Sequence, residues 1–168
     1  MYVKGKFIKL TGLLMRPDEV KRADEYLINA EGVPHTKLVD EDWYDTNVFN
    51  RFKDICAEDS LLKERLYYFV GTRVYPTIKR SAGLPPELVT PLDFIKFEAE
   101  GYLLNHRGEG IVSRKFIHAK DGDVLVEAST PGYKPDFMRG VFAGILAICD
   151  VKTGNVEYLG DDKFHITW

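Results

Sequence analysis

The sequence contains few cysteines, and this scarcity excludes several classes of protein. Cys56 and Cys149 are the only two in 168 residues, and no Cys-x-x-Cys pair occurs. Two thiols cannot complete a structural zinc site unaided, and they provide no disulfide framework. Neither has a candidate base at a fixed sequence offset, so we expect both to be buried as small hydrophobic side chains.

Long apolar runs and single-sign charge are also missing. Segment 141–148 is short and interrupted by small residues, and the first ten residues mix lysines with apolar side chains. We therefore expect a cytoplasmic protein with no membrane span and no signal peptide. The 23 basic and 26 acidic side chains give a net charge of -3, so a nucleic-acid partner is not expected.

What is present is typical of one globular domain. Hydrophobic residues make up 45% and charged residues 29% of the chain, the balance of an ordinary folded protein. A chain of this length buries enough surface to fold without disulfides or metals. We therefore predict a single domain over residues 1–168, with a helical part over about 1–107 and a β-containing part over about 108–168.

The helical part carries several local start and stop signals. Pro17 and the acids that follow it indicate a helix start, and Gly32 is a plausible C-terminal cap. Asp45 or Thr46 can cap a second helix. A third helix is expected after Ser60, interrupted near Pro76, and a fourth runs over about 92–105.

The second part changes to a β-like pattern. Asp121-Gly122 predicts a hairpin between strands 111–118 and 123–129, and residues 160–162 predict a second hairpin before the end of the chain. Residues 136–149 form a buried helix between the two hairpins. The sequence thus predicts an α+β fold in which an N-terminal helical layer packs on a C-terminal four-stranded antiparallel sheet of order β-β-α-β-β.

The sequence contains no recognisable catalytic motif. It lacks a glycine-rich phosphate loop, a His-Glu-x-x-His pair and a Gly-x-Ser-x-Gly elbow. We expect His35 to be exposed, His118 to lie solvated at a strand end and His165 on the polar face of an edge-like strand. His106 follows a helix end that favours a cation, so it is interpreted as a cap. No catalytic residue and no metal ligand are predicted.

Two glycines and a group of aromatic residues are the most unusual features. Gly140 and Gly144 lie inside the predicted helix 136–149, where glycine costs about 0.5–1 kcal/mol relative to alanine. The favoured interpretation is that this helix approaches the sheet closely, with a pocket or another subunit as alternatives. The aromatic residues of the helical part are more typical of a core, but could also surround an apolar ligand. The candidate ligand-binding residues are Tyr67, Tyr68, Phe94, Phe97, Gly140 and Gly144.

The end of the chain resembles one known superfamily. The carrying segments are the helix 92–105, the hairpin, the Ser129-Thr-Pro-Gly132 turn, the glycine-punctuated helix 137–146 and the closing Phe164-His-Ile-Thr-Trp168. This order is similar to that of haem nitric-oxide-binding (H-NOX) domains, the 4-vinyl reductase domain family and the Bet3-like subunits of vesicle-tethering (TRAPP) complexes. The resemblance also implies a homodimer that pairs through its helical part.

The chain departs from the haem-binding members of that superfamily. They carry a histidine on the helix before the hairpin and a Tyr-x-Ser-x-Arg motif on the second strand. Helix 92–105 contains no histidine, His106 comes too late, and the strand reads Glu127-Ala-Ser-Thr-Pro131, which keeps only the serine. The cysteine cluster of zinc-containing relatives is also missing. The resemblance therefore implies no haem, no zinc and no other cofactor here.

Three hypotheses follow from these observations. The first is a stand-alone regulatory, sensor-like domain without haem that binds a small apolar ligand between the helical layer and the sheet. The second is a structural protein–protein interaction module with no small ligand. The third, an enzyme using acids such as Glu98 and Glu100, requires a carboxylate with a perturbed pKa inside a cleft.

Overall fold

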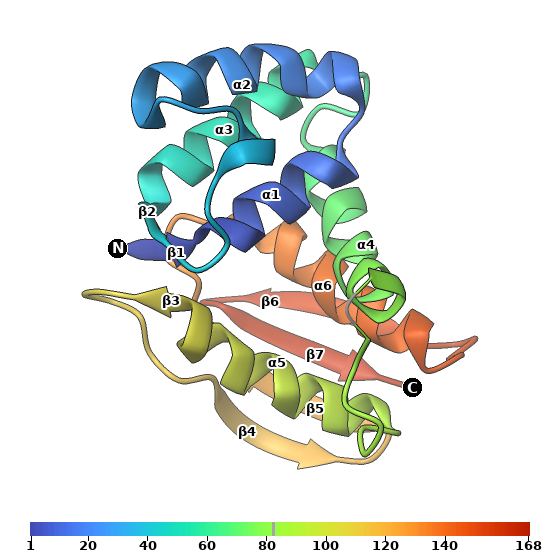
Figure 1. Ribbon diagram of the computed structural model, residues 1–168. Helices are drawn as coiled ribbons and strands as arrows, with labels where there is room; N and C mark the ends of the chain where they lie inside the picture. The colour runs from blue at the N-terminus through green and yellow to red at the C-terminus, as the bar shows by residue number, and fades with distance from the viewer. Residues whose placement is uncertain (82) are drawn as a thin grey trace.

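The computed structural model describes residues 1–81 and 83–168 and consists of a group of helices packed against a twisted sheet (Figure 1). The helices are α1 (Gly5–Leu14), α2 (Pro17–Glu31), η1 (His35–Lys37), α3 (Thr46–Asp59), α4 (Arg65–Ser81), α5 (Pro91–Asn105) and α6 (Pro135–Ile148). The strands are β1 (Tyr2–Lys4), β2 (Trp43–Asp45), β3 (His106–Arg107), β4 (Lys115–Lys120), β5 (Asp123–Glu127), β6 (Asn155–Gly160) and β7 (Lys163–Thr167).

Most helix boundaries follow from local capping signals. Asp45 caps α3 by accepting a hydrogen bond from the Asn47 backbone N–H, and Thr90 forms a capping box with Asp93 at the start of α5. Gly32 ends α2 in the left-handed region with φ 80°. The predicted start after Ser60 is wrong, because residues 61–64 form turns before α4 begins. Pro76 lies inside α4 without ending it.

The four-stranded antiparallel sheet has the order β4-β5-β7-β6, which confirms the α+β fold and the β-β-α-β-β arrangement. Asp161 and Asp162 have φ angles of 48° and 57°, as a tight hairpin turn requires. The second hairpin joins the first through β7 rather than β6 (Figure 1). His165 therefore lies on a central strand, and the prediction of an edge-like strand is wrong.

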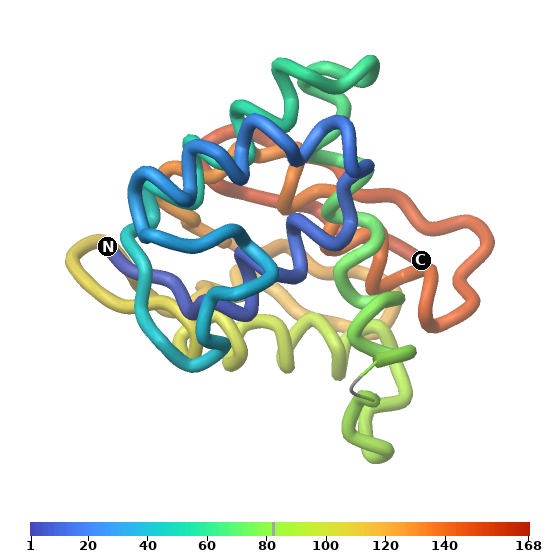
Figure 2. The backbone as a smooth tube through the Cα atoms, turned by 45° about the horizontal axis from the view of Figure 1, so that its top comes forward, coloured from blue at the N-terminus to red at the C-terminus, as the bar shows by residue number. Residues whose placement is uncertain are grey.

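A second, smaller sheet joins the beginning of the chain to its middle. Its order is β2-β1-β3, and Tyr2 and Val3 pair with Arg107 and His106. Figure 2 shows the N-terminus lying beside the loop that follows α5. Strands of two or three residues are too short for a period-2 pattern, so they were not predicted from the sequence. Helix α1 was not predicted either.

Helix α6 forms the centre of the molecule. One face of α6 covers the sheet, where the rings of Phe142 and Phe164 lie 5.5 Å apart. Its glycines, however, face α4 and not the sheet. A Cβ on Gly140 would lie 2.3 Å from the Tyr68 carbonyl oxygen, and one on Gly144 would lie 2.7 Å from that of Thr72. The predicted close approach is therefore to a helix, because Gly71 of α4 faces Gly140 at the crossing.

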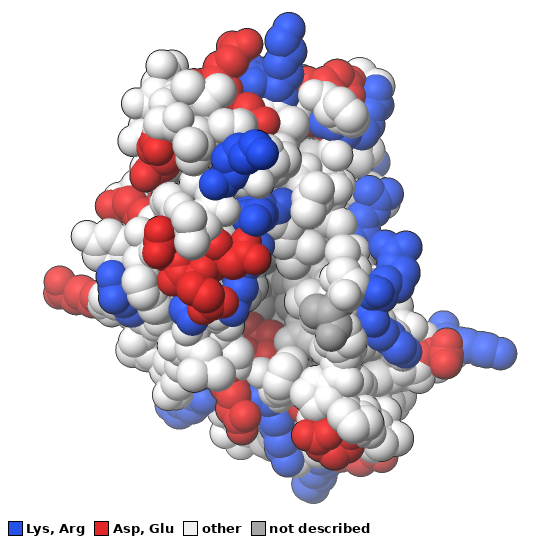
Figure 3. Space-filling model, viewed as in Figure 1, with Lys and Arg blue, Asp and Glu red and all other residues white. Residues whose placement is uncertain are grey.

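Charged side chains of both signs cover the outside. Figure 3 shows a row of basic side chains along α4, where Arg73 and Arg80 are exposed, and an acidic group over the segment before β2. Asp40 and Glu41 of that segment form ion pairs with lysines of β1 and α1. Among the described residues, no helix combines the length and the apolar character needed to cross a membrane.

Candidate functional site: a buried polar cluster

The six residues predicted to bind a ligand are spread over α4, α5 and α6. Tyr67 is buried and its hydroxyl donates to a carboxylate oxygen of Asp54, while the ring of Tyr68 lies 5.4 Å from the Arg139 guanidinium. Phe94 lines an open surface hollow of about 320 Å³, and Phe97 packs against the core. The structure therefore does not gather these four rings around one described cavity.

The two predicted glycines lie at the crossing of α4 and α6. The α4 backbone occupies the space beside both, so neither borders open space in the described structure. A second surface hollow, of about 430 Å³, lies between the end of α1 and α4 and is lined by residues such as Leu13, Arg73 and Arg80. None of the six predicted residues lines it.

A group of polar side chains is instead buried where α5, α3 and the segments around β4 and β5 meet. Arg114, just before β4, is enclosed, with 1% of its side chain exposed. Its guanidinium donates to Glu98 of α5 at 2.8 Å and to the Ser129 carbonyl oxygen at 2.7 Å. It also lies 3.6 Å from the centre of the Tyr102 ring. The charges of Arg114 and Glu98 are thus compensated by a contact between two segments that are distant in sequence.

His106 continues the cluster at the C-terminal cap of α5. Its ring stacks on that of Tyr102, with centroids 4.4 Å apart. Nδ1 lies 3.0 Å from the Tyr102 carbonyl oxygen and Nε2 lies 2.8 Å from the Tyr133 hydroxyl. A carbonyl oxygen only accepts, so Nδ1 carries the proton and Nε2 accepts from Tyr133.

Burial sets the charge of these two groups. It lowers the pKa of His106 to about 4, so the imidazole is neutral at pH 7, and it raises the pKa of Tyr133, which keeps its proton. His106 does occupy the cap position predicted from the sequence. The expectation of a cation there is wrong, because the ring lies among Phe7, Tyr102 and Tyr133 rather than in water.

Lys53 of α3 completes the cluster with an amine that lacks a partner. It is 3% exposed, and its Nζ makes no hydrogen bond with any described residue. Nζ lies over aromatic rings, 3.7 Å from the centroid of Tyr133 and 4.4 Å from that of Phe49. Burial lowers its pKa from 10.5 to about 7, against a smaller opposing effect of Asp54. The amine is therefore about half protonated at neutral pH.

A second buried polar atom without a partner lies one helical turn away. The Asn50 Oδ1 atom has no hydrogen-bond partner among the described residues. Asn50 and Lys53 are three residues apart, so they share one face of α3. The turn that contains Gly132 covers this face, since a Cβ there would lie 2.4 Å from the Asn50 Nδ2 atom. Buried polar atoms normally have partners, so this pair indicates a place for a further polar group.

The sequence patterns did not predict this cluster. Lys53 lies four residues after Phe49 on the apolar stripe of α3, and a charged residue at such a position was the available signal. Arg114 carries no local signal, because its partner Glu98 lies in another element. Glu98 is held by this pair and Glu100 is exposed, so the two acids do not share a cleft.

The remaining histidines divide between interior and surface. His35 is 5% exposed, and its Nδ1 lies 2.8 Å from Asp24 Oδ1, so its predicted exposure is wrong. The η1 turn packs His35 against α1. Its ring occupies the space that a side chain in place of Gly12 would need. His118 and His165 are partly exposed on the sheet, although His118 lies within β4 rather than at its end.

Comparisons with known proteins give a consistent result at the level of fold. No family model matches the chain and no curated protein is similar to it. Solved structures do match, including a mutant Fe(II) unliganded H-NOX protein from K. algicida, with TM-score 0.70, 13% identity, and coverage of 98% of this chain and 95% of that one.

Two further solved structures match the chain to a similar extent. A Tt H-NOX variant matches with TM-score 0.70 and 16% identity, covering 98% of this chain and 94% of that one. A structure concerned with haem redox potential and protein-induced porphyrin distortion matches with TM-score 0.68 and 16% identity, covering 98% and 99%. The helical part, the four-stranded sheet and their order along the chain are those of the H-NOX fold.

Proposed function

We propose that this chain is a sensor-like ligand-binding domain that has the H-NOX fold but works without haem. Its ligand site is the buried polar cluster around Lys53. One observation carries the proposal: a fully enclosed amine and a fully enclosed amide oxygen on the same face of α3 have no partners among the described residues. The similarity of the whole chain to H-NOX structures supports the sensor-like role.

The contacts of this chain's residues do not fit a haem. Helix α5 carries no histidine, and both ring nitrogens of His106 are engaged by Tyr102 and Tyr133. Arg114, the buried arginine that could face a propionate, is already neutralised by Glu98. A haem would have to displace this interior, and each buried charge that lost its partner would cost several kcal/mol.

The chemistry around Lys53 defines the class of ligand. Three aromatic rings, those of Phe49, Tyr133 and Phe137, surround Nζ within 5.4 Å. A ligand here would be small and largely apolar, with one oxygen that accepts a hydrogen bond from Lys53. Tyr133 donates a hydrogen bond to His106 and lies in the turn just before α6. A ligand that moves Tyr133 would therefore change the contact between α3 and α6.

Haem exclusion is tested by adding haemin to the purified chain and recording the visible spectrum. We expect no Soret band of a coordinated haem. A stoichiometric Soret band that disappears in the His106→Ala variant would refute the haem-free proposal. Arg107→Ala serves as the matched control, because Arg107 is the exposed neighbour of His106.

The ligand site is tested by native mass spectrometry of the full chain. We expect a small-molecule adduct on the 19.2 kDa chain that is lost in Lys53→Met and retained in the control Lys134→Met, an exposed lysine nearby. A bare chain in every preparation, with no adduct from a library of small oxygen-containing aromatic compounds, would refute the ligand site. That result would favour the interaction module without a ligand.

The homodimer remains a prediction. Light scattering at micromolar concentrations should give twice the 19.2 kDa chain mass. A single-chain mass throughout that range would contradict it. The relationship to 4-vinyl reductase domains and vesicle-tethering subunits likewise remains a prediction, as does the cytoplasmic location.

A further inference from the structure

Three side chains from three adjacent strands meet on the outer face of the sheet. His118 of β4 and His165 of β7 both pair with Leu125 of β5, one from each side. Directly opposed residues share a face, and residues two apart on a strand share it too. Asp123 therefore lies on the same face as both histidines, in the strand between them.

A β-bulge creates this arrangement. The register between β4 and β5 shifts between Phe116 and His118, so that Phe116 pairs with Val126 whereas His118 pairs with Leu125. Without the extra residue, Phe116 and His118 would lie on one face, because they are two positions apart. The bulge turns Phe116 toward the core and His118 toward solvent. Bulges often redirect a side chain in this way at functional positions.

The ligating atoms converge closely. The Nε2 atoms of His118 and His165 each lie 2.9 Å from the same carboxylate oxygen, Oδ1 of Asp123. The three candidate ligand atoms lie within 4.8 Å of one another. Ligands at about 2.1 Å from a tetrahedral zinc ion are about 3.4 Å apart, so rotamer adjustments suffice to admit an ion. The hydrogen bonds from both histidines lower the pKa of Asp123, which keeps it anionic.

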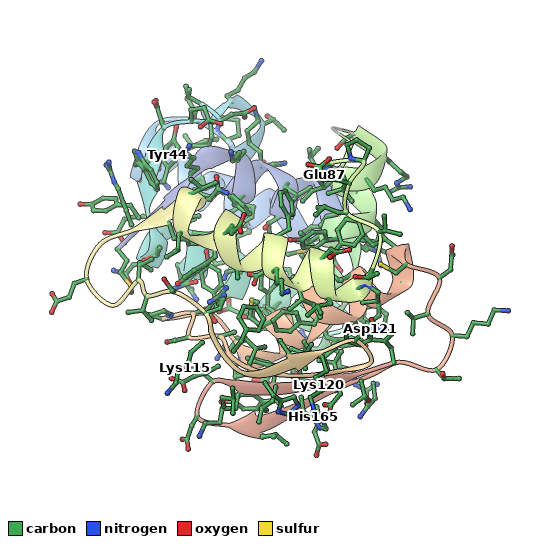
Figure 4. The ribbon with its side chains drawn as sticks, turned by 90° about the horizontal axis from the view of Figure 1, so that it is seen from below. Tyr44, Glu87, Lys115, Lys120, Asp121 and His165 are labelled. Atoms are coloured by element: carbon green, nitrogen blue, oxygen red, sulfur yellow. The ribbon has the colours of Figure 1, made fainter. Side chains whose placement is uncertain are left out.

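The position is open to solvent and to an arriving ion. His118 and His165 have side-chain exposures of 38% and 37% and Asp123 has 52%. Figure 4 shows His165 on the side of the sheet turned away from the helices. Glu157 opposes His165 and Lys120 opposes Asp123 in the strand register, so the charged residues directly opposite the ligands are one of each sign.

We propose that His118, Asp123 and His165 form a binding site for a divalent transition-metal ion of the zinc type. Two imidazoles and one carboxylate suit Zn²⁺ and bind Ni²⁺ and Cu²⁺ by the same chemistry. Three protein ligands leave at least one position for water or a small external ligand. The ion would link β4, β5 and β7, and the site is independent of the interior cluster. The sequence spacing of 118, 123 and 165 matches no metal motif, so only the sheet reveals it.

The proposal is tested by calorimetric titration of the untagged, metal-free chain with Zn²⁺, followed by Co²⁺ as a spectroscopic probe. We expect one ion per chain, and a Co²⁺ absorption spectrum whose intensity indicates four or five ligands. Each of His118→Ala, His165→Ala and Asp123→Asn should weaken binding at least ten-fold. These positions are partly exposed, so we expect all three variants to fold, which circular dichroism would check.

Matched controls separate this site from general surface binding. Lys163→Ala and Glu127→Ala alter the same outer face without touching a proposed ligand, and should leave the affinity unchanged. Binding that survives in His165→Ala, or that falls equally in the control variants, would overturn the proposal. No saturable binding of Zn²⁺ at micromolar concentrations would overturn it as well.

Discussion

The interior cluster around His106 and the outer face around His118 and His165 use the same type of side chain in opposite ways. His106 is 6% exposed, and burial lowers its pKa to about 4. The outer histidines are more than a third exposed and share one carboxylate. The difference shows that solvent access, not residue type, decides whether a histidine is fixed in a network or free to take a new ligand.

The two regions should also differ in how much they contribute to stability. In the interior, removing one member of a network leaves another buried polar group without a partner, and the cost is several kcal/mol. On the outer face, water replaces a lost partner. Substitutions in the two regions therefore test the comparison directly.

The largest effect is expected from Arg114→Met. The variant leaves Glu98 buried with an uncompensated charge, and should lower the free energy of unfolding by about 3–5 kcal/mol in urea denaturation. The double variant Glu98→Gln with Arg114→Met removes both charges and should recover part of this loss. A loss below about 1 kcal/mol in the single variant would mean that the interior is as permissive as the surface.

The next effect concerns the packing that encloses the interior. Gly140→Ala places a Cβ against the α4 backbone and should destabilise the fold by about 1–3 kcal/mol, with Gly144→Ala acting in the same direction. Gly101 of α5 is the matched control, because a Cβ there meets no atom within 4 Å. Gly101→Ala should stabilise by up to about 1 kcal/mol through helix propensity. If Gly140→Ala stabilised the fold as Gly101→Ala does, the close packing of α4 and α6 would be contradicted.

Lys53 gives the interior a distinct pH dependence. Its folded pKa of about 7 lies below the unfolded value of 10.5, so between these values the unfolded chain binds more protons and stability rises with pH. We expect an increase of about 1 kcal/mol from pH 7 to pH 8 that is missing in Lys53→Met. Urea unfolding at both pH values measures it. Equal pH dependence of the two proteins would show that the amine is solvated.

The smallest effect is expected on the outer face. In metal-free buffer, His118→Ala and His165→Ala should each change the free energy of unfolding by less than about 0.5 kcal/mol, as surface substitutions usually do. Thermal unfolding with a chelator present measures this. A loss comparable to that of Arg114→Met would remove the distinction between the two regions.

The sequence predicted those features that depend on neighbouring residues. Pro17 and Gly32 indicated the two ends of α2 because a first-turn proline and a left-handed cap are local signals, and Asp121-Gly122 indicated the first hairpin because the turn needs positive φ at Gly122, observed at 84°. Phe164 and Ile166 alternate with polar residues along β7, and each lies in the core with at most 1% exposed. These signals lie within one turn of helix or one strand.

Other features could not be predicted, because they depend on segments far apart in the chain. Gly140 was associated with the sheet, but a glycine records only that something approaches closely, and α4 proved to be that neighbour. His35 was expected in water, but Asp24 and the ring of Phe52 enclose it. The resemblance indicated the fold, but gave no information about the partners of Arg114.

The sequence by itself determined most of the helices, the two hairpins and the α+β fold, because capping, turn geometry and hydrophobic period act over short distances. Only the tertiary structure decided the strand order, the isolation of the Lys53 amine and the meeting of His118, Asp123 and His165. Each of these depends on which distant surfaces pack together and on how much water they exclude. Desolvation and strand register are properties of the assembled core, and no local pattern encodes them.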